Sequence, residues 1–157
     1  AGGWLSLAPS VPGDIAWFDC QTGQNLFIQS ESYLACTANV ETDTKFQGAK
    51  GMFSGESLFF IRAFSQAGVG RVYYNSYGAV KQIPVQPGQT ITVDTGHLVA
   101  YTEGLQYTIG KVGGMKSLVF GGEGLVMHFQ GQGTIWVQTR NIGGLANTLM
   151  PFFPSNG

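Results

Sequence analysis

The stretch GQNLFI (Gly23–Ile28) is matched 65 residues later in the chain by GQTITV (Gly88–Val93). The same offset of 65 pairs LACT (Leu34–Thr37) with VAYT (Val99–Thr102). Self-similarity at one fixed spacing indicates a repeated structural unit. This repeat therefore decides the fold that the rest of the sequence is expected to adopt.

Two further pairs of segments match in the same order, with small changes in spacing. FSGESL (Phe53–Leu58) matches FGGEGL (Phe120–Leu125) at an offset of 67. GRVYY (Gly70–Tyr74) matches GTIWV (Gly133–Val137) at an offset of 63. A single matching pair of segments could arise by chance, but several matching pairs in the same order along the chain are hard to explain by chance. The sequence therefore predicts an internal duplication.

The duplication divides the chain into four segments, because Gly13 and Gly78 also match at the offset of 65. The predicted segments are an N-terminal strand and lead-in (1–11), a first β-unit (12–78), a second β-unit (79–141) and a C-terminal tail (142–157).

Alternating apolar residues predict strands within the units. In TITVD (Thr90–Asp94), Ile91 and Val93 lie on one face and the polar residues on the other. Turns such as QPGQ (Gln86–Gln89) separate these runs, and their Pro and Gly suit a type II turn. No segment keeps a 3.6-residue period, so we expect an all-β sandwich or barrel. The tail is expected to hold at most one helical turn and to pack against the rest.

Composition narrows the function classes. Aromatic residues make up 13% of the chain, so a folded core is expected. Charged residues make up only 11%, against about 25% in an ordinary soluble protein, which suggests that partner subunits cover much of the surface. The net charge is −1 and no basic run occurs, which argues against nucleic acid and against a polybasic membrane-binding surface.

The two cysteines, Cys20 and Cys36, leave two interpretations open. Two small buried thiols in a reducing compartment are favoured, and a disulfide in an oxidising compartment is the alternative. The compartment stays undetermined. The cytoplasm is favoured for a bacterial or archaeal protein and the mitochondrion for a eukaryotic one, while the low charge and the cysteines leave an extracellular location open.

The sequence contains only two histidines, His97 and His128, as candidates for metal binding or catalysis. Asp94 and His97 offer two ligands where a metal needs three or four, and no His-x-His pair of the cupin type is present. Asp94 is therefore expected to serve a turn and His97 a strand. His128 is expected to pack or to lie at an interface. Serine-hydrolase and phosphate-loop patterns are also missing, so we predict no cofactor and no enzyme activity.

Two matched glutamates, Glu56 and Glu123, sit at equivalent places in the two units. They are interpreted as structural residues that cap turn amides or pair with a cation such as Arg62 or Arg140. The alternative is a pair of carboxylates acting in one site. Aromatic residues on strands, expected to be exposed, complete the set of interaction candidates. They are Tyr73, Tyr74, Tyr77 and Trp136.

Four segments resemble one known family, the TRAP-like "altered inheritance of mitochondria" family. They are APSVPGDI (Ala8–Ile15), VDTGHLVA (Val93–Ala100), KSLVFGGEGLV (Lys116–Val126) and GQGTIWVQTR (Gly131–Arg140). The resemblance covers nearly the whole chain. It implies two TRAP-like β-units per chain, related to the double-stranded β-helix, and assembly as trimers.

The resemblance implies little biochemistry. Mitochondrial members are linked to inner-membrane organisation and respiratory-complex integrity, and no catalytic residues carry over. RNA binding by the namesake, the tryptophan RNA-binding attenuation protein, uses basic residues that have no comparable cluster here. We therefore expect a self-assembling scaffold, a trimer or larger, with at most indirect membrane association. A small-molecule or lipid-binding barrel lined by Phe and Met is the alternative, and a metal-assisted enzyme is a weaker one.

Overall fold

The computed structural model describes residues 2–44, 59–111 and 125–153, and these residues form a mostly β protein. Its twelve strands are β1 (Ile15–Gln21), β2 (Asn25–Gln29), β3 (Tyr33–Cys36), β4 (Val40–Asp43), β5 (Phe60–Ser65), β6 (Val69–Asn75), β7 (Val80–Val85), β8 (Thr90–Asp94), β9 (Leu98–Thr102), β10 (Leu105–Lys111), β11 (Leu125–Gly131) and β12 (Gly133–Gln138). One α-helix, α1 (Ile142–Leu149), follows them.

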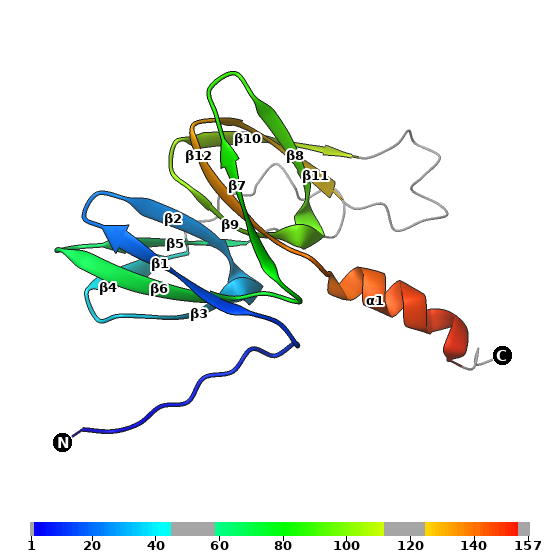
Figure 1. Ribbon diagram of the computed structural model, residues 1–157, viewed down its shortest axis with the longest axis horizontal. Coiled ribbons are helices and arrows are strands. Elements are labelled where there is room, and N and C mark those ends of the chain that lie inside the picture. The colour runs from blue at the N-terminus through cyan, green and yellow to red at the C-terminus, as the bar shows by residue number, and fades with distance from the viewer. Residues whose placement is uncertain (1, 45–58, 112–124, 154–157) are drawn as a thin grey trace.

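The strands form three antiparallel sheets. Two are three-stranded, with the orders β1-β6-β3 and β10-β11-β8, and the third has six strands in the order β4-β5-β2-β9-β12-β7. Strands β1–β6 lie together at the lower left of Figure 1 and β7–β12 lie above them. The six-stranded sheet joins these two halves, because β2 of the first pairs with β9 of the second.

The pairing pattern of the first half recurs in the second. Ile15 lies opposite Asn75 between β1 and β6, and Val80 lies opposite Gln138 between β7 and β12. One short 3-10 helix, η1 (Ser30–Ser32), precedes β3, and another, η2 (Thr95–His97), precedes β9. The β3–β6 ladder and the β9–β12 ladder are irregular at equivalent positions. In each ladder one residue, on β3 or on β9, has no partner in register. Those residues are Leu34 and Val99, which are 65 apart.

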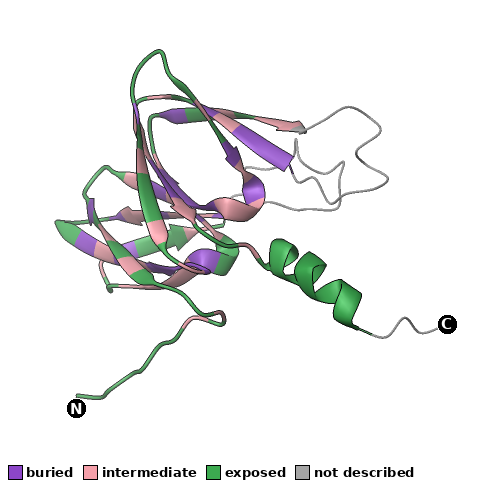
Figure 2. Cartoon of the chain, turned by 45° about the vertical axis from the view of Figure 1, so that its right-hand side comes forward, coloured by how far each residue is buried: buried purple, intermediate pink, exposed green. Residues whose placement is uncertain are grey.

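The strands enclose two apolar cores, whose buried residues are coloured purple in Figure 2. The first core gathers buried residues from β1, β2, β4, β5 and β6, among them Leu26 and Val72, together with residues of β9 and β12. The second core gathers buried residues from β7 to β12, among them Met127 and Phe129, together with Phe60 of β5. Strand β12 is covered on both faces, because its neighbours Ile135 and Trp136 belong to different cores.

The predicted turn at Gln86–Gln89 is confirmed. The amide of Gln89 donates to the carbonyl oxygen of Gln86 at 3.0 Å, and Gly88 has a φ of 82°. The equivalent turn in the first half has the same bond, from Gln24 to Gln21 at 3.0 Å, and Gly23 has a φ of 85°. A positive φ at this corner is what glycine accepts without steric cost.

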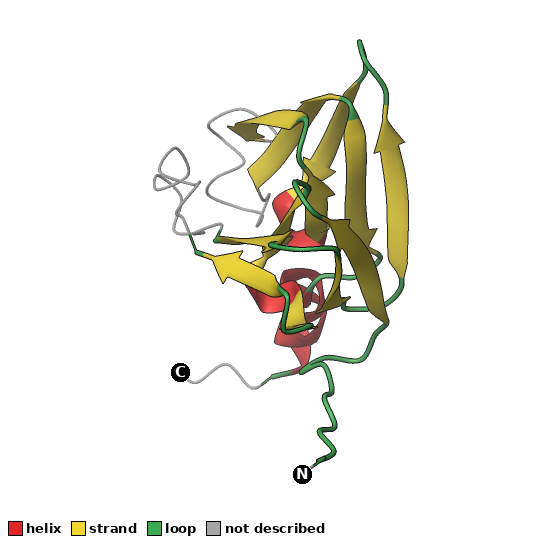
Figure 3. Ribbon diagram, turned by 90° about the vertical axis from the view of Figure 1, so that its left-hand side faces the viewer, coloured by secondary structure: helices red, strands yellow, loops and turns green. Residues whose placement is uncertain are grey.

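Both ends of the chain differ from the sequence-based expectation. Residues 2–12 contain no strand, and the first strand begins at Ile15. The tail forms α1, which is longer than the single turn expected, and all eight of its residues are exposed. Asn141 begins this helix by accepting a hydrogen bond from the amide of Gly144. The helix extends away from the sheets instead of packing on them, and Figure 3 shows it at the same lower end of the β structure as the N-terminal lead-in.

Three of the four aromatic residues expected to be exposed are buried inside the single chain. Tyr74, Tyr77 and Trp136 are at most 8% exposed, and Tyr73 is half-buried. The expectation failed because these strands are covered by sheets that the sequence pattern does not place. The cysteines are free thiols: Cys20 is buried and Cys36 is half-buried on β3.

Candidate functional site

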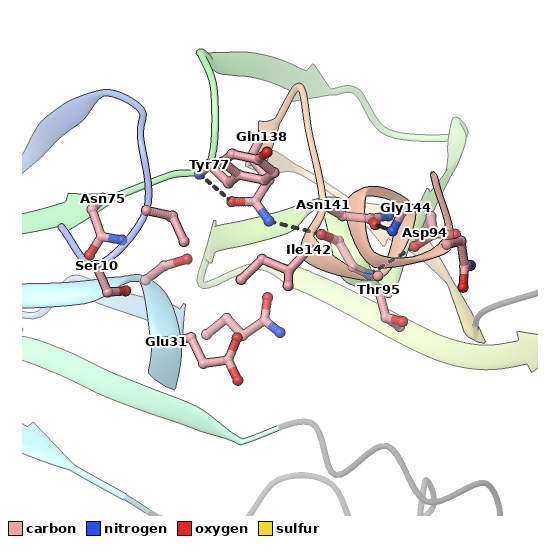
Figure 4. Close-up of a pocket in the computed structure, with 16 residues that line it drawn as sticks. Ser10, Glu31, Asn75, Tyr77, Asp94, Thr95, Gln138, Asn141, Ile142 and Gly144 are labelled. Carbon is pink, nitrogen blue, oxygen red and sulfur yellow. Dashed lines mark hydrogen bonds between the residues drawn. The ribbon is translucent and has the colours of Figure 1, made fainter. Parts of the chain in front are cut away.

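A cleft of about 570 Å³ opens where the two halves meet the start of α1. Figure 4 shows residues of both halves around it. Its walls come from the N-terminal lead-in, the 3-10 helices η1 and η2, the ends of β6 and β12, and the first turns of α1. The lining residues are Ser10, Val11, Gln29, Glu31, Ser32, Asn75, Tyr77, Asp94, Thr95, Gly96, Gln138, Asn141, Ile142, Gly143, Gly144 and Asn147.

Gln138, at the end of β12, forms hydrogen bonds with two separate walls of the cleft. Its Oε1 accepts a hydrogen bond from the amide of Tyr77 at 2.8 Å, and its Nε2 donates to the carbonyl oxygen of Gly96 at 2.9 Å. Its own carbonyl oxygen lies 2.8 Å from Nδ1 of His97. One side chain thus ties the junction between the halves to η2, as Figure 4 shows in part.

Most of the side chains that line the cleft are polar, and the charged ones are acidic. Glu31 and Asp94 are its charged lining residues, and Oδ1 of Asp94 accepts a hydrogen bond from the amide of Gly96 at 2.8 Å. The lining contains no histidine, cysteine, lysine or arginine. It therefore offers no cationic side chain to bind a phosphate group.

The structure separates the residues singled out from the sequence. Asp94 lines the cleft and accepts a hydrogen bond from the amide of Gly96 in η2. His97, expected on a strand, is instead the last residue of η2, and its Nδ1 lies beside the carbonyl oxygen of Gln138. Arg140 lies beside the same junction, with its guanidinium carbon 5.9 Å from the centre of the Tyr77 ring. Trp136 is core, at 4% exposure. Sequence analysis missed Gln138 and its counterpart Asn75, because an amide at a strand end gives no signal that separates it from a solvated surface residue.

The remaining predicted residues lie elsewhere or outside the described segments. His128 is on β11, where its Nδ1 lies 2.8 Å from Oγ1 of Thr92 on β8. Glu56 and Glu123 lie outside the described residues. Their proposed cation Arg62 forms an ion pair with Asp43 at 3.0 Å.

Neither a metal cluster nor a spanning helix is found in the part of the chain that the structure describes. Residues 2–44, 59–111 and 125–153 contain no group of three His, Cys, Asp or Glu side chains placed to hold a metal ion. No helix in these segments is long and apolar enough to cross a membrane.

The sheet edges form a second candidate surface. Among the described strands, β1 and β7 are edge strands at equivalent places in the two halves, and so are β4 and β10. Strands β3 and β8 are different, because they are edges while their counterparts β9 and β2 pair with each other. An edge strand presents unpaired backbone donors and acceptors to any chain that fits it.

Comparison with known proteins places the chain in a family. The family model described as mitochondrial biogenesis AIM24 matches residues 1–140. The chain belongs to this AIM24 family. The resemblance seen in the sequence is thereby confirmed.

Two streptococcal proteins are similar to this AIM24-family chain. An uncharacterized protein of Streptococcus pyogenes serotype M6, M6_Spy0233, is 30% identical over 155 residues, which cover 98% of this chain and 61% of that protein. The crystal structure of protein SPYM3_0169 from Streptococcus pyogenes matches with a TM-score of 0.75 and 29% identity, over 93% of this chain and 63% of that one. The chain therefore spans less than two thirds of both relatives.

Proposed function

We propose that this protein is a non-enzymatic structural protein that assembles into a ring of three copies. Each copy contributes two TRAP-like β-units, of the double-stranded β-helix or sandwich type, that arose by internal duplication. Six similar units then form a pseudo-six-fold ring. As a scaffold, such a ring would act by self-assembly and could support membrane-associated complexes indirectly.

The duplication is supported by pairings that recur at the same offset. The strand order β1-β6-β3 corresponds to β7-β12-β9, and β4-β5-β2 corresponds to β10-β11-β8. The 3-10 helices η1 and η2 and the two ladder irregularities correspond in the same way. Two unrelated halves would have no reason to share these details.

The observation that best supports the ring is that β3 and β8 are unpaired sheet edges among the described strands. Inside the chain, Leu26, Phe27 and Ile28 of β2 lie opposite Thr102, Tyr101 and Ala100 of β9. If successive copies repeat this join, β8 of one copy pairs with β3 of the next. Shifting β2 forward and β9 back by 65 residues places Ile91, Thr92 and Val93 opposite Thr37, Cys36 and Ala35.

Such a join is head-to-tail, so it closes into a ring when the rotation between units divides a full turn. Ring closure also covers the edges that would otherwise pair with other chains. The low content of charged residues, 11%, is in keeping with a surface partly covered by neighbouring copies.

Light scattering coupled to size exclusion tests the ring. A trimer of 16.8 kDa chains should scatter as a particle of three times that mass at micromolar concentration. A particle with the mass of one chain across that range would contradict the proposal.

The cleft favours a second candidate function, the binding of a small polar molecule. Its polar lining suits such a ligand better than a lipid, because the Phe and Met residues expected to line a lipid site, such as Met127 and Phe129, are packed in the core. Native mass spectrometry of the purified protein tests it. A retained small molecule that is lost in a Gln138→Ala variant would support binding, and a ligand-free wild type would argue against it.

A further inference from the structure

Helix α1 presents an apolar stripe that the described chain leaves largely exposed, although its first residue, Ile142, also lines the cleft. Ile142, Leu145 and Leu149 are 53%, 42% and 42% exposed, and Phe152 just beyond the helix is 81% exposed. Their spacing of three, four and three residues is that of the a and d positions of a heptad. Figure 2 shows the helix exposed along its whole length.

A helix of this kind needs a partner. It has eight residues, whereas isolated helices shorter than about 12–15 residues are marginal in water. It also contains two adjacent glycines, Gly143 and Gly144, which weaken a helix interior. The cap formed by Asn141 satisfies one amide of the first turn and leaves the apolar stripe in water.

The proposed ring places the start of this helix near the ring axis. Gly13 and Gly78 are equivalent positions of the two units, and they form a β-bridge with each other. In a ring of six units, a rotation of about 60° relates each unit to the next. Two equivalent points and the axis then form an equilateral triangle, so the distance from each point to the axis equals the distance between the two points. Bridged backbones lie about 5 Å apart, so the axis passes about 5 Å from Gly78.

Helix α1 begins beside the same bridge. The amide of Arg140 donates to the carbonyl oxygen of Tyr77 at 3.2 Å, and Asn141 follows directly as the helix cap. In a ring of three copies, the first residues of the three α1 helices therefore lie close to the axis and close to one another.

We infer that α1 packs the stripe formed by Ile142, Leu145 and Leu149 against the same stripe of the neighbouring copies, around the ring axis. The occupant of this surface is thus a second copy of the chain. The inference rests on the proposed ring and adds to it a second contact, independent of the strand edges. A membrane surface is the less suitable occupant, because interfacial helices usually carry Lys or Arg on the polar face and residues 141–157 contain no charged side chain.

Cysteine cross-linking of the full chain tests this contact. Leu149→Cys lies on the stripe and Asn147→Cys lies on the opposite face, and both are placed in a Cys20→Ala, Cys36→Ala background whose mass is first measured by light scattering. Under mild oxidation Leu149→Cys should give cross-linked dimers of chains in high yield, and Asn147→Cys should give at least tenfold less.

A second pair of variants measures the contribution of the stripe. Leu145→Asp with Leu149→Asp should raise the concentration at which the oligomer dissociates by at least tenfold, whereas Asn147→Asp should leave it unchanged. Because the helix lies outside both cores, these variants should keep the thermal stability of the β structure.

The outcomes separate the helix contact from the ring. A wild-type chain that is monomeric overturns both. A trimeric wild type in which Leu149→Cys fails to cross-link, and in which the double aspartate variant dissociates like wild type, overturns the helix contact alone. Sedimentation of the wild type with phosphatidylcholine–phosphatidylglycerol vesicles, abolished by the double variant without any change in dissociation, would assign the stripe to lipid and also overturn the inference.

Discussion

The join between β2 and β9 inside the chain and the open edges of β8 and β3 occupy equivalent places but differ in chemistry. At the internal join, the rings of Phe27 and Tyr101 stack at 5.0 Å, and Phe60 meets Tyr101 edge-on at 5.3 Å. At the open edges the counterparts of Phe27 and Tyr101 are Thr92 and Cys36. One join is thus aromatic and buried, while the other is small and polar.

This difference indicates a division of roles. Aromatic pairs bury a large apolar area and add about 0.5–1.5 kcal/mol beyond it, so the internal join behaves as part of the core. The outer face beside β8 carries the contact between Thr92 and His128 at 2.8 Å, which stays hydrated in a single chain. We expect the halves to unfold together and the copies to separate reversibly.

The largest effect is expected from Tyr101→Ala. Tyr101 is 2% exposed and touches four aromatic rings, so its removal leaves a cavity at the internal join. The free energy of unfolding in urea should fall by about 3–5 kcal/mol. Cys36→Ala, at the equivalent place on the open edge, is the control and should cost less than about 1.5 kcal/mol. Equal losses would mean that the two joins do not differ as described.

Gly13→Ala should have the next largest effect. A Cβ atom there would lie 1.9 Å from the carbonyl oxygen of Ser76, so the bridge to Gly78 must open. We expect a loss of about 3 kcal/mol, the upper end for overpacking. Gly23→Ala, whose Cβ would meet open space at a φ of 85°, should cost about 1 kcal/mol. Thermal unfolding of both variants gives the comparison, and a harmless Gly13→Ala would exclude a tight junction.

Alkaline pH should weaken both cores. Burial raises the pKa of Tyr74 from 10.0 to about 12, and burial together with neighbouring Tyr107 also raises the pKa of Tyr101. Because the folded-state pKa is raised, the stabilisation is complete below pH 10 and is lost as the pH rises toward 12. Melting temperatures measured from pH 8 upward should stay level and then fall above pH 10. Tyr74→Phe should shift the fall to higher pH, and an unchanged profile would contradict the role of burial.

His128→Ala is expected to have the smallest effect on the folded chain. His128 is only partly buried and its partner Thr92 is exposed, so the free energy of unfolding of the single chain should change by less than about 0.5 kcal/mol. The concentration at which copies dissociate should nevertheless rise severalfold, because His128 contacts Thr92, which the proposed ring places opposite Cys36 of the next copy. Sedimentation velocity measures it, and dissociation like that of the wild type would place His128 outside the interface.

Much of the β structure was predictable from alternation. Val93 is buried while Thr90 and Thr92 are exposed, as the period of two requires, because β8 has one face on a core and one in water. Alternation failed at Trp136, because β12 lies between two cores and both of its faces are covered. A pattern of single residues does not reveal which strands a sheet places at its centre.

The ends and the cleft were less predictable. Helix α1 has its apolar residues at helical spacing, but Gly143 and Gly144 oppose a helix, so propensity and pattern conflicted. Asp94 was recognisable as a turn residue because its short carboxylate suits an amide two residues on. Gln138 was not recognisable, because its partners at Tyr77 and Gly96 are distant in sequence and meet only in the folded chain.

One measurement tests the equivalence of the two joins most directly. The register carried over from β2 and β9 places Thr92 of one copy opposite Cys36 of the next. A Thr92→Cys variant that keeps the native Cys36 should therefore form disulfide-linked chains under mild oxidation, up to a closed ring of three. Thr90→Cys, exposed on the same face of β8 but out of register, should link far less. Equal linking by both variants, or none by Thr92→Cys in a particle of trimer mass, would contradict the pairing of β8 with β3.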